Sequence, residues 1–242
     1  MKKPILLGML TPSSNTTLEP MTSAMVSTLP GVSAHFSRFT VTEISLGKQA
    51  SGQFDDTKIL EAAKLLADAR VDVIGWSGTA ASWLGFEADE HLCRRITEST
   101  GIPATTSVLA LNEVLHRTGV KTLGLISPYL KAVQDKILQN YGRSGIDITA
   151  ERHLDLQVNY SFAEVTETQI LEMARDVALQ RPDAMTVMCT NLKGARLAER
   201  IEQETGIPLY DSVSTVVWKS LLIAGYDVAE LKGWGQLFQT PL

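Results

Sequence analysis

The sequence predicts an α/β fold of two pseudo-symmetric, Rossmann-like halves, each a parallel sheet flanked by helices, with a functional site in the cleft between them. The first observation is an internal repeat: "LGMLTP" at 7–12 recurs as "LGLISP" at 123–128. A second pair, "ITESTGIPATTSV" at 96–108 and "IEQETGIPLYDSV" at 201–213, follows in the same order. Two copies of a unit of roughly 110 residues explain both pairs.

Strands and helices alternate within each half. Short apolar runs predict buried strands at 5–11, 34–41 and 71–76, and again at 121–126, 146–152 and 184–188. Between them, apolar residues recur at helical spacing in "DDTKILEAAKLLADAR", "EVTETQILEMARDVALQ" and "KGARLAERIEQETG". This alternation is typical of parallel sheets that helices cover on both faces.

The repeat also predicts the domain boundaries. The first half spans 1–115 and the second 116–220. The remaining tail, 221–242, contains Trp234 and Phe238, and we expect it to pack back on the first half.

Composition excludes several classes of function. The net charge is −5 and no block of Lys and Arg stands out, so we expect no nucleic-acid partner. No apolar run approaches the roughly 18 residues of a membrane span, and the short N-terminal run is not a signal peptide. Two cysteines make no disulfide framework, which favours a cytoplasmic protein with reduced thiols.

Polar segments follow four of the predicted strands: "TPSSN", "WSGT", "SPY" and "MCTN". Ligands of parallel sheets bind beyond the carboxyl ends of the strands, so these segments are expected to line one cleft. Cys189 follows a strand and precedes a helix, where a thiolate is favoured, although free cysteines are often simply buried. Cys93 lies in a helical pattern and is interpreted as structural.

Ser77 is interpreted as the counterpart of Cys189 in the first half, with the second strand one residue longer than the first. The other candidates would bind an anionic group through hydroxyls, amides or backbone N–H groups: Pro12, Ser13, Asn15, Gly78, Thr79, Tyr129, Asn159, Thr190 and Asn191. Helix capping, turn formation and packing are the structural alternatives for these residues. The apolar walls are assigned to Ala80, Leu84, Val158 and Met188.

Motifs for metals and nucleotides are missing from the sequence. The four histidines are scattered without metal-ligand spacing, and no GxGxxG follows a strand. We therefore expect no metal, no nucleotide and no other cofactor.

The repeat, the paired strand ends and "GMLTPSSNTTLEP" resemble the aspartate/glutamate racemase superfamily, and in particular its branch of maleate isomerases and arylmalonate decarboxylases. The resemblance extends to "GWGQLF" at 233–238. It implies a cofactor-independent enzyme and a homo-oligomer. In that superfamily racemases and isomerases carry a cysteine in each half, whereas the decarboxylase keeps the second, which Cys189 matches.

The resemblance assigns roles to the other candidates as well. Asn15, Asn159 and Tyr129 match residues that hold a substrate carboxylate, and the segment 77–79 covers part of the decarboxylase's carboxylate site. Ser77 in place of a cysteine departs from the racemases and isomerases, because a hydroxyl is a far weaker acid than a thiol.

The sequence thus favours a decarboxylase of a small malonate-type dicarboxylate, in which Cys189 protonates an enediolate. Three alternatives stay open. They are a maleate cis–trans isomerase that uses Ser77, a one-base racemase or lyase, and a dicarboxylate-binding module without catalysis.

Overall fold

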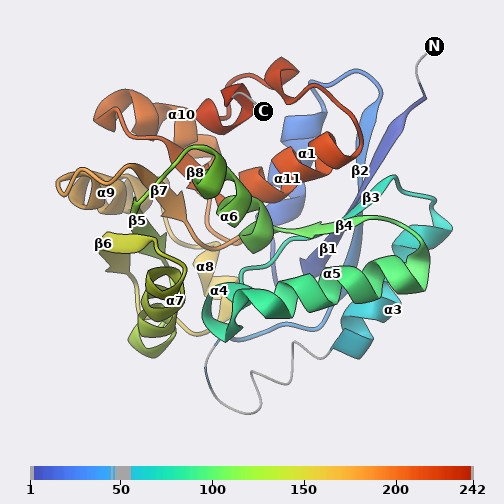
Figure 1. The fold of residues 1–242 in the computed structure, drawn as a ribbon, viewed down its shortest axis with the longest axis horizontal. Helices are drawn as coiled ribbons and strands as arrows, with labels where there is room; N and C mark the ends of the chain where they lie inside the picture. Colours follow the sequence, from blue (N-terminus) through green and yellow to red (C-terminus); the bar gives the residue numbers. More distant parts are fainter. Residues whose placement is uncertain (1–2, 45, 47–55, 241–242) are drawn as a thin grey trace.

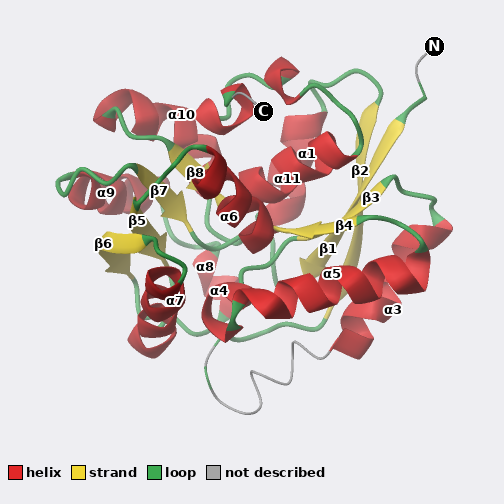
Figure 2. Cartoon of the chain, in the orientation of Figure 1, coloured by secondary structure: helices red, strands yellow, loops and turns green. Residues whose placement is uncertain are grey.

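The computed structural model describes residues 3–44, 46 and 56–240 and confirms the predicted fold class. Two four-stranded parallel sheets have the strand orders β2-β1-β3-β4 and β6-β5-β7-β8 (Figure 1). Helices flank both sheets (Figure 2). In the first half, α3 and α5 pack together on one side of the sheet, and α1 and α11 pack together on the other.

The strands of the first sheet are β1 (Ile5–Pro12), β2 (Val32–Phe39), β3 (Val73–Trp76) and β4 (Ala104–Thr106). Those of the second are β5 (Thr122–Ser127), β6 (Asp147–His153), β7 (Ala184–Val187) and β8 (Leu209–Asp211). β4 and β8 are not predicted from the sequence, because a strand of three residues is too short to show a periodic pattern of apolar residues.

The α-helices are α1 (Leu18–Val26), α3 (Asp56–Asp68), α4 (Ala81–Leu84), α5 (Phe86–Thr100), α6 (Ser107–Arg117), α7 (Lys131–Arg143), α8 (Asn159–Phe162), α9 (Glu167–Ala178), α10 (Gly194–Thr205) and α11 (Ser212–Ile223). Two short 3₁₀ helices follow, η2 (Val228–Glu230) and η3 (Gln236–Gln239). No helix within the described part of the chain is long and apolar enough to cross a membrane.

Helix α11 ties the two halves together. It packs against α6 and against β3 and β4 of the first sheet, and the Thr215 hydroxyl donates to the Ser107 carbonyl at 3.0 Å. The chain changes sheet between β4 and β5, a stretch that includes the proposed boundary at 115/116. Because α11 belongs to the second half by sequence but covers the first sheet, the exact boundary stays a prediction.

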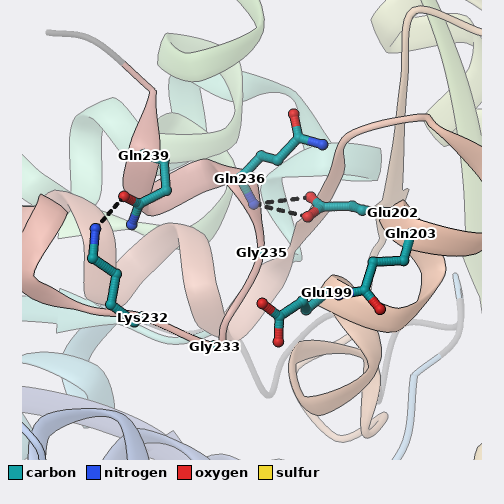
Figure 3. Close-up of a pocket in the computed structure, with 8 residues that line it drawn as sticks. All are labelled: Glu199, Glu202, Gln203, Lys232, Gly233, Gly235, Gln236 and Gln239. Carbon is teal, nitrogen blue, oxygen red and sulfur yellow. Dashed lines mark hydrogen bonds between the residues drawn. The ribbon is translucent and has the colours of Figure 1, made fainter.

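The end of the C-terminal tail contacts the second half. Its backbone N–H at Gln236 donates to both carboxylate oxygens of Glu202 on α10, at 2.8 and 3.1 Å (Figure 3). The Trp234 ring stacks under the Arg196 guanidinium, and η3 contacts β8 and α11. Residues 234–236 thus contact the second half, where the buried carboxylate on α10 accepts an N–H, although the tail was expected to pack on the first half. The packing of the whole tail stays a prediction, because its first residues belong to α11, which covers the first sheet.

The contact between β3 and α11 leaves no room for a side chain at Gly75. A Cβ there would lie 2.9 Å from Val216 Cγ2 and 3.0 Å from Met9 Sδ. Gly75→Ala is therefore expected to lower the free energy of unfolding by about 1–3 kcal/mol through overpacking. Denaturant unfolding monitored by circular dichroism measures it.

The matched control is Gly142→Ala on α7, where a Cβ would meet nothing within 4 Å. In a helix this change should raise the free energy of unfolding by about 0.5–1 kcal/mol. Equal effects of the two substitutions would contradict the close approach of α11 to β3.

Candidate active site

Strand ends from both halves meet at one small cavity of about 20 Å³. Seven predicted site residues line it, together with five apolar or aromatic ones: Pro12, Gly78, Thr79, Tyr129, Asn159, Cys189 and Thr190, with Val41, Ile44, Trp76, Ala80 and Trp83. The segment after β2 and the segment before α8 close over it through an antiparallel bridge between Glu43 and Val158. Even malonate is larger than this space, so a ligand of that class must displace lining side chains or this cover.

Cys189 projects into the cavity two residues beyond β7 and is 3% exposed. Its sulfur accepts a hydrogen bond from the Asn191 backbone N–H at 3.3 Å. Burial raises the pKa of the thiol to about 12, although this N–H and the Tyr129 hydroxyl act in the opposite direction. The expected thiolate at a helix N-terminus is therefore not favoured: loss of water outweighs the nearby donors, and the thiol keeps its proton.

Tyr129 joins the thiol to the opposite half. Its hydroxyl forms a hydrogen bond of 2.6 Å with the Thr79 hydroxyl and lowers the pKa of the Cys189 thiol, which lines the same cavity. The ring lies edge-on to Trp83 and Phe162, with centroid distances of 5.2 and 5.8 Å. Burial raises the pKa of Tyr129 well above its usual value, so this phenol stays a donor.

Backbone amides add further donors at the same place. The hydrogen bonds found among the described residues leave the N–H groups of Gly78, Thr79 and Thr190 without an acceptor. Successive free amides beside hydroxyl donors form a pocket that suits a carboxylate or a developing oxyanion. The anion binding predicted for the strand-end segments stays a prediction, and these donors are the groups that would provide it.

Three predicted binding residues do not line the cavity, and two of them, Asn15 and Asn191, serve the contact between the halves. Asn15 Nδ2 donates to Thr190 Oγ1 at 3.1 Å, and its Oδ1 accepts from two backbone N–H groups at the start of α1. Asn191 accepts from the amides of residues 16 and 17 and donates to the Asn159 carbonyl at 2.6 Å. Ser13 hydrogen-bonds to the backbone of Val41. Asn15 and Asn191 therefore join the strand ends of the two halves, whereas Ser13 bonds within the first half.

Ser77 is not the counterpart of Cys189. The registers pair Leu7 with Val73 in the first sheet and Leu123 with Ala184 in the second, so the two repeats superpose without an extra residue. The amide of Ser77 donates to the Leu10 carbonyl as that of Met188 does to Ile126. Gly78 thus occupies the place of Cys189.

The Ser77 side chain also points away from the cavity. Its hydroxyl is fully buried and lies 3.8 Å from Met9 Sδ. The predicted catalytic role of Ser77 therefore has no geometric support, because its hydroxyl does not reach the space where a substrate would sit.

The walls differ in part from the expectation. Ala80 lines the cavity as predicted, but Leu84 and Val158 are 47% and 56% exposed and Met188 is buried outside it. Val41, Ile44, Trp76 and Trp83 were missed. Each lies in or beside an apolar run, where nothing in the sequence distinguishes a cavity wall from ordinary core.

Two other features of the described residues lie apart from this chemistry. A groove beside the tail is lined by Glu, Gln, Gly and Lys residues and contains no thiol or hydroxyl side chain (Figure 3). Cys93 sits on α5 in a shallow surface pocket with Arg94, Thr97 and Glu98. Within the same part of the chain, no three His, Cys, Asp or Glu side chains are grouped to hold a metal ion.

The sequence profile of the arylmalonate decarboxylase family matches residues 7–238. The chain belongs to this family. It is also 24% identical to a maleate isomerase of Geobacillus stearothermophilus over 91% of this chain and 92% of that one. The arylmalonate decarboxylase of Bordetella bronchiseptica is 22% identical, with 83% and 85% covered.

A solved structure shares the fold as well. The maleate cis-trans isomerase of Nocardia farcinica, as a cysteine-to-serine mutant with a covalently bound succinylcysteine intermediate, superposes with a TM-score of 0.89 at 23% identity, covering 98% of this chain and 99% of that one. The family and these relatives establish a cofactor-independent isomerase or decarboxylase.

The buried thiol gives a titration that can be measured. In a Cys93→Ser background, Cys189 should stay protonated through pH 10 and deprotonate only near pH 12, against about 9 for an exposed thiol. The folded state then binds more protons than the unfolded state between these values, so stability should fall as pH rises from about 9 to about 12.

Thiolate absorbance in the ultraviolet measures this titration, with Cys93→Ser/Cys189→Ala as the blank. The same protein in denaturant should titrate near its ordinary value. Half-deprotonation of the folded protein near pH 9 would show that the thiol is not buried as described.

Proposed function

We propose that the protein is a cofactor-independent decarboxylase of a malonate-type dicarboxylate, with Cys189 as the proton donor. One observation carries the proposal: the cavity holds a single thiol, and the equivalent place in the other half is Gly78. Decarboxylation needs one acid on one face, whereas a two-base racemase needs one on each. A protonated thiol suits an acid better than a nucleophile, which must be a thiolate.

The donors at the strand ends would hold the carboxylate that stays. Thr79, Tyr129 and the free amides of 78, 79 and 190 are in place before the reaction, so they can stabilise the charge that develops on its oxygens. The other carboxylate would lie against the apolar walls, where it loses its water shell. That loss favours departure as neutral CO₂.

The bond between the α-carbon and the departing carboxylate breaks, and its electron pair passes into an enediolate on the retained carboxylate. Cys189 Sγ then gives its proton to the α-carbon, leaving a monocarboxylate and a thiolate. The Asn191 N–H, which already bonds to the sulfur, and the Tyr129 hydroxyl, which lowers the pKa of the thiol, stabilise that thiolate until a proton from water restores the thiol.

A maleate isomerase is the second candidate, because most of the similar curated proteins are maleate isomerases. In the Nocardia structure one cysteine carries the succinyl group while another is replaced by serine. The present chain has two cysteines, and Cys93 lies in a different pocket from Cys189. An isomerase here would have to form and resolve the covalent bond with Cys189 alone.

Proton NMR in D₂O distinguishes the two reactions. With methylmalonate we expect loss of one carboxylate and one deuteron added at the α-carbon, and phenylmalonate should react in the same way but more slowly. Cys189→Ala should reduce the rate by at least roughly 10²-fold, as removal of a positioned general acid does. Maleate should stay unchanged.

The other outcomes are equally distinct. Fumarate formed from maleate would make the protein an isomerase. Deuterium exchange at the α-carbon without loss of carboxylate would indicate a one-base racemase, and binding of dicarboxylates without turnover would indicate a binding module. Any of these three results would contradict the decarboxylase.

A second test compares two hydroxyls that differ by two positions. Thr79→Val removes a donor at the retained carboxylate and should lower kcat/KM roughly 10²-fold. Ser77→Ala should leave kcat/KM within about twofold, because its hydroxyl faces Met9. A large loss in Ser77→Ala with little in Thr79→Val would restore Ser77 as the catalytic hydroxyl.

A further inference from the structure

Trp76 ends β3 and forms part of the cavity wall. Its side chain is 2% exposed, and the ring packs against Phe39 with a centroid distance of 5.0 Å and an interplanar angle of 48°. The ring is therefore held from one side by the core of the first half while its other side faces the site.

The edge of this indole lies directly over the α-carbon of Gly78. A Cβ on residue 78 would come within 2.1 Å of Cζ2, 2.4 Å of Cε2 and 2.6 Å of Cη2. These are rigid ring atoms, so no side chain fits at residue 78 unless the indole moves. Trp76 thus occupies the space that a side chain of residue 78 would fill.

The second half shows the opposite arrangement. The sheet registers make Val187 the counterpart of Trp76, just as Cys189 is the counterpart of Gly78. A small residue ends β7 and the thiol projects beyond it, whereas a large ring ends β3 and no side chain projects. The two strand ends therefore differ: the first carries Trp76 and Gly78, and the second carries Val187 and Cys189.

We propose that Trp76 is a specificity-determining residue: its indole closes the face opposite Cys189, excludes an acid at position 78, and limits the α-carbon of the ligand to a small substituent. The class of ligand, a malonate-type dicarboxylate, rests on the proposed function. The steric part rests on the geometry of Trp76 and Gly78 alone. Hydrogen and methyl are the substituents that fit, and a phenyl group should be hindered.

The steric part is tested without ligand by a thermal cycle, that is, a double-mutant cycle of Trp76 and Gly78 in which melting temperatures are compared. Gly78→Ala should lower the Tm by about 5 °C or more when Trp76 is present, as overpacking does in a chain of this size. In a Trp76→Leu background the same change should lower it by less than about 2 °C. Equal shifts in the two backgrounds would overturn the proposal.

The ligand part is tested by calorimetry in a Cys189→Ala background, where turnover does not interfere. Trp76→Leu should improve the affinity for phenylmalonate relative to methylmalonate by at least about tenfold. Trp83→Leu, which removes an indole from another wall of the same cavity, should change both affinities in parallel. The role of Trp76 in selecting substrates by size would be overturned if Trp76→Leu left the ratio of the two affinities unchanged. It would also be overturned if Trp83→Leu changed that ratio by the same factor.

Failure of the proposed function gives a different result. If neither malonate binds to any variant, the ligand class is wrong and the claim on substrate size falls with it. The thermal cycle still decides whether Trp76 excludes a side chain at position 78.

Discussion

Exclusion of water from the space between the two sheets is the constraint on which the site depends. The cavity is too small to hold more than a water molecule or so, and Cys189 is almost fully buried in it. Without water, a thiolate loses its solvation and the thiol keeps its proton. The same loss of water strengthens each hydrogen bond that Tyr129, Thr79 and the free amides could give to a carboxylate. One physical condition thus underlies both roles in the proposed reaction, the acid and the carboxylate site.

That condition depends on the contact between the halves. Asn15 and Asn191 cross it with amide hydrogen bonds, and α11 of the second half covers the first sheet. Because a buried side-chain amide costs free energy unless its donors and acceptors are paired, these residues fix the relative position of the strand ends. Asn15 and Asn191, which were assigned to substrate binding from the sequence, therefore serve the cavity itself, because they keep it closed and free of bulk water.

A duplicated architecture with unequal strand ends explains how one fold can favour one-sided chemistry. The registers of the two sheets repeat, so the backbone offers two equivalent positions at residues 78 and 189. Trp76 leaves room for hydrogen alone at the first, whereas the second carries the thiol and its strand ends at the smaller Val187. The symmetry of the backbone is thus broken by the volume of one side chain at the end of each central strand.

The sequence by itself determined the fold class, the repeat, the place of Cys189 at a strand end and the segments that meet at the cavity. It could do so because the period of apolar residues and the placement of polar residues after strands are local patterns. The tertiary structure decided that Gly78, not Ser77, faces Cys189, that Trp76 forms a wall, that the thiol stays protonated and that residues 234–236 contact α10. Register, burial and close approach depend on residues far apart in the chain, so no local pattern contains them.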